Sequence, residues 1–144
     1  MPKLNIQKAE LTGIKLMKVF EHIDGSHMSL FKVHGLSGPQ YNVLRILRGA
    51  QGEDLNCHEV GNRMLKRVPD VTRLLDRLEQ RKLITRWRCS DDRRVVRTRI
   101  TAEGLQLLAD IDKPLQNQVK QDFRHFDNTK LAELDRLLDA LLPE

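Results

Sequence analysis

The spacing of apolar residues divides the chain into helical segments that flank one segment of a different period. Apolar side chains recur at intervals of three and four within residues 11–33 and 41–47, as they do along one face of a helix. Gly25 and Ser26 interrupt the first segment, which therefore predicts either one bent helix or two. Gly35 follows the last apolar residue of that segment and is expected to end the helix as a C-cap.

Other residues mark where the next helices begin. Ser37 followed by Gln40 matches a capping box, in which each residue's side chain accepts a hydrogen bond from the other's backbone N–H. Asn56 with Glu59 is a second pair of this kind and predicts a short helix. Pro69 is expected at the first position of the following helix, which would run to about residue 81. Two helices joined by a turn of roughly three or four residues are typical of a helix-turn-helix.

After residue 82 the helical period is lost. Residues 83–89 and 95–101 are rich in Val, Ile, Thr and Trp, and a turn-forming segment, residues 90–93, lies between them. These segments predict a β-hairpin directly after the helix-turn-helix, an element known as a wing. The helical period returns at Thr101, and Pro114 is expected to kink this helix or to split it in two. A last helix is expected to start at Asn128 or Thr129.

Together the elements predict a mainly α fold of the α+β class, with a small β-hairpin wing. We assign residues 36–104 to a winged helix-turn-helix DNA-binding domain, and residues 4–35 and 105–144 to a helical dimerisation region. The last helix carries six leucines between residues 131 and 142, and two long apolar terminal segments favour an intersubunit bundle in a homodimer. The residues expected to form this interface are Leu16, Phe20, Leu131, Leu134, Leu138 and Leu141.

Positive charge is concentrated in the middle of the chain. The net charge is +5, but residues 63–99 hold 13 Lys and Arg against 5 Asp and Glu, whereas the rest holds 12 against 15. This asymmetry favours a surface that faces DNA phosphates. From charge alone, a solvated charged face is the alternative interpretation.

The basic segment combines two shapes that suit the grooves of DNA. A helix over residues 69–81 has an apolar side and a polar side, and such a helix fits the major groove, where arginine binds guanine or phosphate. The hairpin carries six arginines, and arginine at a hairpin tip suits the narrow minor groove. We expect Arg94 to be inserted there, with Asp92 as a buttress that orients its guanidinium by an ion pair. The residues expected to contact DNA are Pro69, Asp70, Thr72, Arg73, Arg77, Arg88, Arg93, Arg94 and Arg97.

Several motifs in order and register resemble the MarR family of winged-helix regulators. They are LSGPQYNVL at residues 36–44, VPDVTRLLDRL at 68–78, LI at 83–84, DRR at 92–94 and ITAEG at 100–104. The resemblance covers about residues 36–105, and the outer helices match in pattern only. It implies a dimeric regulator, a repressor released by a small-molecule ligand, that reads a pseudo-palindromic DNA operator with one recognition helix and one wing per subunit.

The resemblance also implies roles for particular residues. Asp92 and Arg94 match the family's Asp-x-Arg wing motif, and the recognition-helix contacts fall within residues 69–77. A small aromatic or phenolic effector would bind in a cleft between the dimerisation helices and the winged helix. Lys82 departs from the family, which usually has glycine there, and a positive φ at a non-glycine residue costs roughly 1 kcal/mol. Candidates to line the cleft are Phe20, Phe31 and Tyr41, for each of which a core position is the more ordinary interpretation.

Other functions find little support in the sequence. No apolar run approaches the roughly 18 residues of a membrane span, and the N-terminus lacks a signal-peptide pattern, so we expect a cytoplasmic protein without a membrane partner. We find no glycine-rich phosphate loop, metal-ligand cluster or nucleophile–base pair, and therefore expect no catalytic residue, metal or cofactor. Two alternatives stay open: an architectural or protein-docking module, and a thiol-based redox-sensing regulator that uses Cys57 or Cys89.

Overall fold

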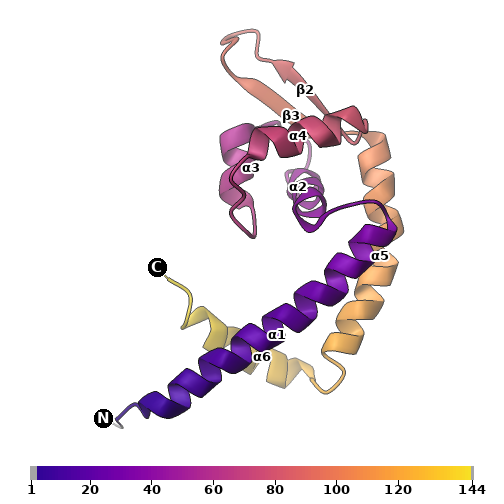
Figure 1. Ribbon diagram of the computed structural model, residues 1–144. Coiled ribbons are helices and arrows are strands. Elements are labelled where there is room, and N and C mark those ends of the chain that lie inside the picture. Colours follow the sequence, from indigo (N-terminus) through magenta and orange to yellow (C-terminus); the bar gives the residue numbers. More distant parts are fainter. Residues whose placement is uncertain (1–2, 144) are drawn as a thin grey trace.

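The structure of the protein, a computed structural model, describes residues 3–143 (Figure 1). It confirms a mainly helical fold with a small antiparallel sheet. The elements follow one another in the order α1 (Ile6–Val33), α2 (Gly38–Gly49), β1 (Leu55–Asn56), α3 (Cys57–Arg63), α4 (Val71–Gln80), β2 (Ile84–Arg88), β3 (Val96–Ile100), α5 (Ala102–Asp122) and α6 (Asn128–Asp139).

Helix α2 lies at the centre of the fold, where Figure 1 shows it nearly end-on between α1, α4 and α5. Apolar side chains from these helices and from the sheet enclose it, and each fully buried leucine contributes about 1.5–3 kcal/mol to folding. The ring of Phe31 on α1 stacks on that of Tyr41 on α2, with centroids 3.9 Å apart. The side chains with least exposure in this core are Val43, Leu44, Val60, Leu75, Leu78, Leu108 and Ile111.

Three of the predicted helix-end signals, at Gly35, Ser37 and Asn56, are confirmed. Both capping boxes are present, with Ser37 and Asn56 as the N-cap residues of α2 and α3. After α1, Gly35 has a φ of 72°, and the next N–H, that of Leu36, donates to the carbonyl of Phe31 at 3.0 Å. This backbone turn closes the helix and directs the chain into α2.

The long terminal segments are simpler than predicted. Helix α1 runs without a break through Gly25 and Ser26, where the hydroxyl of Ser26 donates to the carbonyl of Ile23 at 2.9 Å. Helix α5 likewise continues through Pro114 as one helix, so of the two predicted alternatives, a kink or a split, the split is wrong. A proline inside a helix removes one backbone N–H, and the remaining turns of this 21-residue helix hold it together.

The sheet contains one strand that the sequence did not reveal. The hairpin of β2 and β3 is confirmed, with Ile84 opposite Ile100 and Arg88 opposite Val96. The two-residue strand β1 pairs antiparallel with the other edge of β3 and gives the order β1-β3-β2. A strand of two residues is too short to show an alternating pattern, yet it fixes the base of the hairpin to the start of α3.

The connection between α3 and α4 is longer than predicted. It spans residues 64–70 rather than three or four residues, and α4 begins at Val71. Pro69 is therefore not the first helical residue. Asp70 is the N-cap, and its carboxylate accepts the backbone N–H of Arg73 at 2.9 Å. Capping requires a side-chain acceptor, which Asp70 provides, whereas a start at Pro69 would have used Val68 as the cap.

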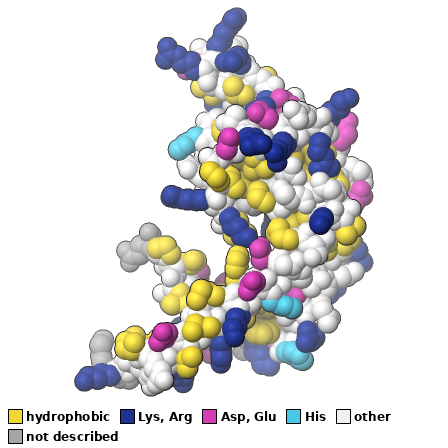
Figure 2. All heavy atoms as spheres, viewed as in Figure 1, with side chains coloured by type: hydrophobic (Ala, Val, Ile, Leu, Met, Phe, Trp, Pro, Cys, Tyr) yellow, Lys and Arg dark blue, Asp and Glu magenta, His cyan; other side chains and the backbone are white. Residues whose placement is uncertain are grey.

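The terminal helices leave much apolar surface uncovered. Figure 1 shows α6 crossing behind the N-terminal half of α1, at a distance from the winged helix, and α6 contains no buried residue. In Figure 2 the exposed apolar side chains gather along α1 and α6. They include five of the residues predicted to form a dimer interface, namely Leu16, Phe20, Leu131, Leu138 and Leu141; the sixth, Leu134, is half-buried.

Candidate nucleic-acid interface

Helix α4 presents a polar face to the surface. Leu75 and Leu78 are buried beneath it, while Thr72, Arg73 and Arg77 are exposed. Because the buried pair fixes the rotation of the helix, the exposed side chains of its first two turns point away from the core. This is the geometry that a helix needs to enter a groove of DNA.

An ion-pair network fixes the hairpin against α4. Arg86 on β2 donates to the carboxylates of Asp76 and Glu79 on α4, the latter at 3.0 Å. Burial acts to lower the pKa of Arg86, but its hydrogen bonds to the two carboxylates outweigh that effect and raise the pKa above its usual value. The hairpin therefore has a defined position relative to the helix, and Arg86 is not available for other partners.

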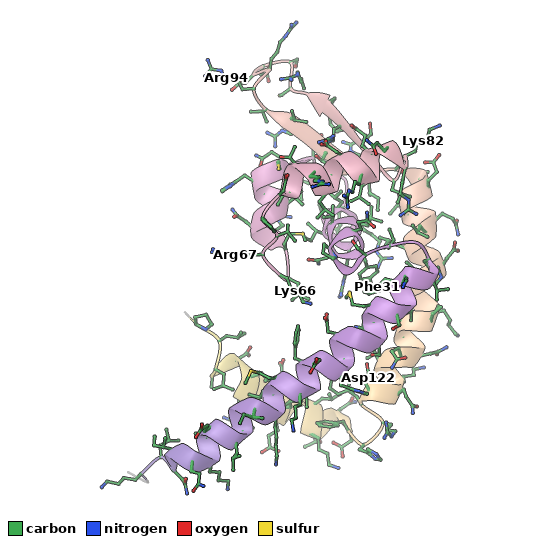
Figure 3. The ribbon with its side chains drawn as sticks, viewed as in Figure 1. Phe31, Lys66, Arg67, Lys82, Arg94 and Asp122 are labelled. Carbon is green, nitrogen blue, oxygen red and sulfur yellow. The ribbon has the colours of Figure 1, made fainter. Side chains whose placement is uncertain are left out.

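The tip of the hairpin holds exposed arginines. Figure 3 shows Arg94 at the tip, pointing away from the body of the protein, and Arg93 beside it is also exposed. Arg88 is partly committed, since its Nη1 donates to the carbonyl of Arg93 at 2.8 Å. Arg93 and Arg94 are thus the cations best placed to reach a groove.

Asp92 supports the tip in a different way from the one predicted. The backbone N–H of Arg94 donates to its Oδ1 at 3.0 Å, and the N–H of Val95 donates to its carbonyl at 3.0 Å. No ion pair joins Asp92 to the Arg94 guanidinium among residues 3–143, so that prediction is wrong. A short aspartate side chain reaches the backbone two residues ahead more readily than the end of a long side chain, and it shapes the turn instead.

The arginines at the base of the hairpin are neutralised within the protein. Arg97 lies 3.3 Å from the carbonyl of Asp54 and 3.6 Å from the carboxylate of Glu59. Arg99 pairs with the side chain of Asp54 at 2.7 Å. Arg97 was predicted to contact DNA, and the structure turns it toward β1 and α3 rather than toward the tip.

Two exposed cations near α4 were not singled out from the sequence. Arg63 ends α3, and Arg67 lies in the following loop, where Figure 3 shows it pointing outward. Both belong to the basic segment, so charge counting could have found them. A predicted turn of only three or four residues left no room for this basic loop beside the start of α4.

The two cysteines are both free thiols and partly buried. Cys57 opens α3, and its Sγ lies 3.6 Å from the hydroxyl of Thr72 on α4. A chemical change at this thiol would therefore alter the surroundings of Thr72, an exposed residue of the candidate interface. Cys89 follows β2, where its N–H donates to the carbonyl of Val95 at 2.8 Å.

Comparison with known proteins agrees with this geometry. A profile of the MarR family matches residues 34–95. The crystal structure of a MarR transcription factor from Planctomyces limnophilus is 33% identical, covers 97% of this chain and 98% of its own, and superposes with a TM-score of 0.71. The chain belongs to the MarR family. Its fold and family are those of DNA-binding transcription regulators and not of enzymes.

Curated members of the MarR family show the same relationship. The transcriptional regulator MhqR of Bacillus subtilis is 31% identical over 98 residues, which are 68% of this chain and 66% of that protein. The homoprotocatechuate degradative operon repressor of Escherichia coli is 25% identical over 129 residues, or 90% of this chain and 86% of that protein. None of the helices within residues 3–143 is long and apolar enough to cross a membrane.

The MarR fold of this chain contains a cavity of about 430 Å³ beneath the winged helix. Side chains of α1, α2, α5 and the α3–α4 loop surround it, and Figure 2 shows the surface hollowed between α1 and the winged helix. The stacked rings of Phe31 and Tyr41 form part of its wall. Burial raises the pKa of the Tyr41 hydroxyl, an effect that the nearby guanidinium groups of Arg45 and Arg48 partly oppose. Phe20, by contrast, lies outside the cavity.

The cavity is lined by three cations with different partners. Arg48 holds Asp112 through two hydrogen bonds of 3.1 and 2.9 Å. Lys66 pairs with Asp24 at 2.8 Å. Arg45 makes no ion pair with any residue of the described chain, 3–143. An anion in the cavity would therefore find one unpaired guanidinium beside an aromatic wall.

Proposed function

We propose that this MarR-family protein is a homodimeric repressor that binds a pseudo-palindromic operator and leaves it when a small aromatic anion binds. One observation carries the DNA-binding part: α4 exposes its cationic face, and the hairpin fixed against it by Arg86 exposes further arginines at its tip. A helix in the major groove and a wing in the minor groove would use both. Thr72, Arg73, Arg77, Arg93 and Arg94 are the proposed contacts, with Arg88 in support.

The homodimer is supported by the uncovered apolar faces of α1 and α6. Helix α6 has no buried residue, so none of its leucines is fully covered within the described part of the chain. We propose that residues 4–35 and 105–144 form the dimerisation region, and residues 36–104 the DNA-binding domain. Two recognition helices on one face of DNA would sit roughly 34–36 Å apart, which requires an inverted repeat.

The effector is supported by the cavity and its charges. A volume of about 430 Å³ is within the range for small-molecule sites. Phe31 and Tyr41 offer an aromatic wall, and Arg45 offers a cation for a carboxylate or phenolate. The E. coli relative is named for the operon that degrades homoprotocatechuate, which is 3,4-dihydroxyphenylacetate, and that hydroxylated aromatic acid is a suitable first probe.

The experiment that tests this function is a binding selection from genomic fragments, with the purified full chain at near-physiological salt and with competitor DNA. We expect enrichment of one inverted repeat. Enrichment of an asymmetric half-site would contradict the dimeric mode of binding. Uniform binding that weakens steeply with salt would favour the architectural alternative.

Thiol sensing is the second candidate, because Cys57 touches Thr72. It predicts that peroxide releases the protein from the selected repeat and that Cys57→Ser prevents the release. Cys89→Ser is the matched control, since Cys89 lies in the hairpin and contacts the backbone of Val95. If both variants are released as the unmodified protein is, thiol sensing is excluded.

A further inference from the structure

A polar contact links the loop before α4 to helix α1. The ammonium group of Lys66 lies 2.8 Å from the carboxylate of Asp24, which is 42 residues earlier in the chain, and 5.0 Å from the centre of the Phe20 ring. Figure 3 shows Lys66 at the part of the loop nearest α1, whereas Arg67 points the other way. Lys66 thus faces α1, whereas the adjacent Arg67 faces the candidate DNA surface.

The same loop leads directly into α4. Lys66 precedes the N-cap Asp70 by four residues, and the N–H of Leu65 donates to the side chain of Asn42 on α2 at 2.8 Å. With its backbone held by α2 and its side chain held by α1, the loop has a defined position. The position of the loop therefore also fixes the position of the first turn of α4, which carries Thr72 and Arg73.

The contact also borders the cavity, since both Asp24 and Lys66 line it. Three cavity residues contact an aspartate: Arg48 makes two hydrogen bonds to Asp112, Lys66 makes one to Asp24, and the His27 ring lies 3.2 Å from Asp122. An ammonium group that makes one hydrogen bond and sits on a flexible side chain is easier to separate from its carboxylate than a guanidinium that makes two. A second carboxylate near Lys66 would also repel that of Asp24.

We propose that the ion pair between Asp24 and Lys66 is a latch that holds α4 in its DNA-binding position, and that an anion in the cavity opens it. The anion binds Arg45 and draws the Lys66 ammonium from Asp24, which frees the α3–α4 loop. This rests on the proposed function, in which a small anion releases the protein from DNA. It adds the residue pair through which the cavity acts on the recognition helix.

The variant that tests the latch is Asp24→Asn, which removes the charge and keeps the shape. Glu21→Gln is the matched control, because Glu21 is exposed on the same helix and has no hydrogen bond or ion pair to another side chain within residues 3–143. Both variants lose one negative charge, which by itself strengthens binding to DNA. If the latch exists, Asp24→Asn alone weakens binding to DNA. Its affinity for the selected repeat is expected to fall by about two- to fivefold, the size of effect typical of a half-exposed ion pair.

A second measurement needs neither DNA nor ligand. Hydrogen–deuterium exchange of residues 64–73 is expected to be faster in Asp24→Asn than in the unmodified protein and in Glu21→Gln, with the core of α2 unchanged. Equal exchange in all three proteins would overturn the latch. So would an affinity in Asp24→Asn that equals or exceeds that of Glu21→Gln.

The anion is tested with 3,4-dihydroxyphenylacetate and its uncharged analogue 4-methylcatechol. The acid is expected to speed exchange of residues 64–73 in the unmodified protein and to have little further effect in Asp24→Asn, whereas the analogue leaves both unchanged. If the acid alters neither exchange nor DNA binding, the proposal that an anion opens the latch is wrong for hydroxylated aromatic acids. If no inverted repeat is selected, the proposed function fails, and exchange in Asp24→Asn still decides on the latch.

Discussion

The guanidinium of Arg81, at the C-cap of α4, donates a hydrogen bond to the carbonyl of Gly35 at 2.5 Å. Gly35 lies at the junction of α1 and α2, so this bond joins the end of α4 to the end of α1. Asp24 and Lys66 make the corresponding link at the beginning of α4. Both ends of α4, the proposed recognition helix, are thus connected to the α1 segment.

Gly35→Ala is expected to destabilise the fold. The φ of 72° costs a residue with a side chain about 1–2 kcal/mol, and an added Cβ would lie 3.3 Å from a guanidinium nitrogen of Arg81. Urea unfolding would measure the loss. Gly25→Ala is the control, because its Cβ would meet no atom within 4 Å and alanine favours a helix. An equal effect at both positions would contradict the importance of this junction.

Arg94→Ala is expected to weaken binding to the selected repeat by about 1–3 kcal/mol while the fold stays intact. The side chain is exposed at the tip of the hairpin and has no ion-pair partner within the described residues, so its loss is expected to remove the proposed contact to DNA without disturbing the fold. Titration of labelled duplex measures the change. Lys120→Ala, on the far end of α5, removes the same charge and should leave affinity nearly unchanged.

Arg73→Ala is expected to weaken binding as well, and the pattern over mutated repeats identifies its partner. If Arg73 binds a base, the preference at one position of each half-site relaxes. If it binds a phosphate, every sequence weakens alike and the dependence of affinity on salt becomes shallower by about one unit. Unaltered affinity and preference would remove Arg73 from the interface.

Leu138→Glu is expected to produce monomers with poor affinity for DNA, because it places a charge in the apolar face of α6. Leu138 is 39% exposed in the single chain. Leu105→Glu provides the control on α5, where Leu105 has a similar exposure of 43%. Sedimentation at several concentrations distinguishes monomers from dimers, and a dimer of undiminished stability in Leu138→Glu would place the interface elsewhere.

Lys82→Gly is expected to raise the free energy of unfolding by up to about 1 kcal/mol. Lys82 has a φ of 60° after α4, the strained conformation that the resemblance to the MarR family implied for this position. The greater freedom of glycine in the unfolded chain offsets part of this gain. Lys82→Val should destabilise the protein, since a β-branched residue tolerates positive φ least, and thermal unfolding of the three proteins provides the ranking.

The features that could be predicted from the sequence are those decided by neighbouring residues. The capping pairs at Ser37 and Asn56, the turn at Gly35 and the hairpin all depend on contacts within a few positions. The positive φ of Lys82 is local in the same sense. Where two local signals compete, as for Pro69 and Asp70, the side chain that can accept a hydrogen bond determined the start of the helix.

Features that depend on distant parts of the chain could not be predicted. Strand β1 exists because Leu55 meets Thr98, and Arg97 is turned inward because Asp54 and Glu59 lie beside it. The family resemblance implied a cleft here, but it did not indicate that Lys66 lines it together with residues of α1, α2 and α5. The periodicity of apolar residues does not indicate such long-range pairings. The charge count that indicated DNA binding could likewise not distinguish the exposed Arg94 from Arg97, which is paired within the protein.

Helix α5 joins the two halves of the molecule as a single rod. Thr101, its N-cap, donates to the carbonyl of Lys82 at the base of the wing, and its other end lies beside α6. Its 21 residues span about 30 Å at 1.5 Å per residue. A tilt of about 6° at one end therefore moves the other by about 3 Å, close to the 3.4 Å between successive base pairs. As a lever of this length, α5 would convert a slight change in subunit packing of the proposed dimer into a mismatch of one step along the double helix.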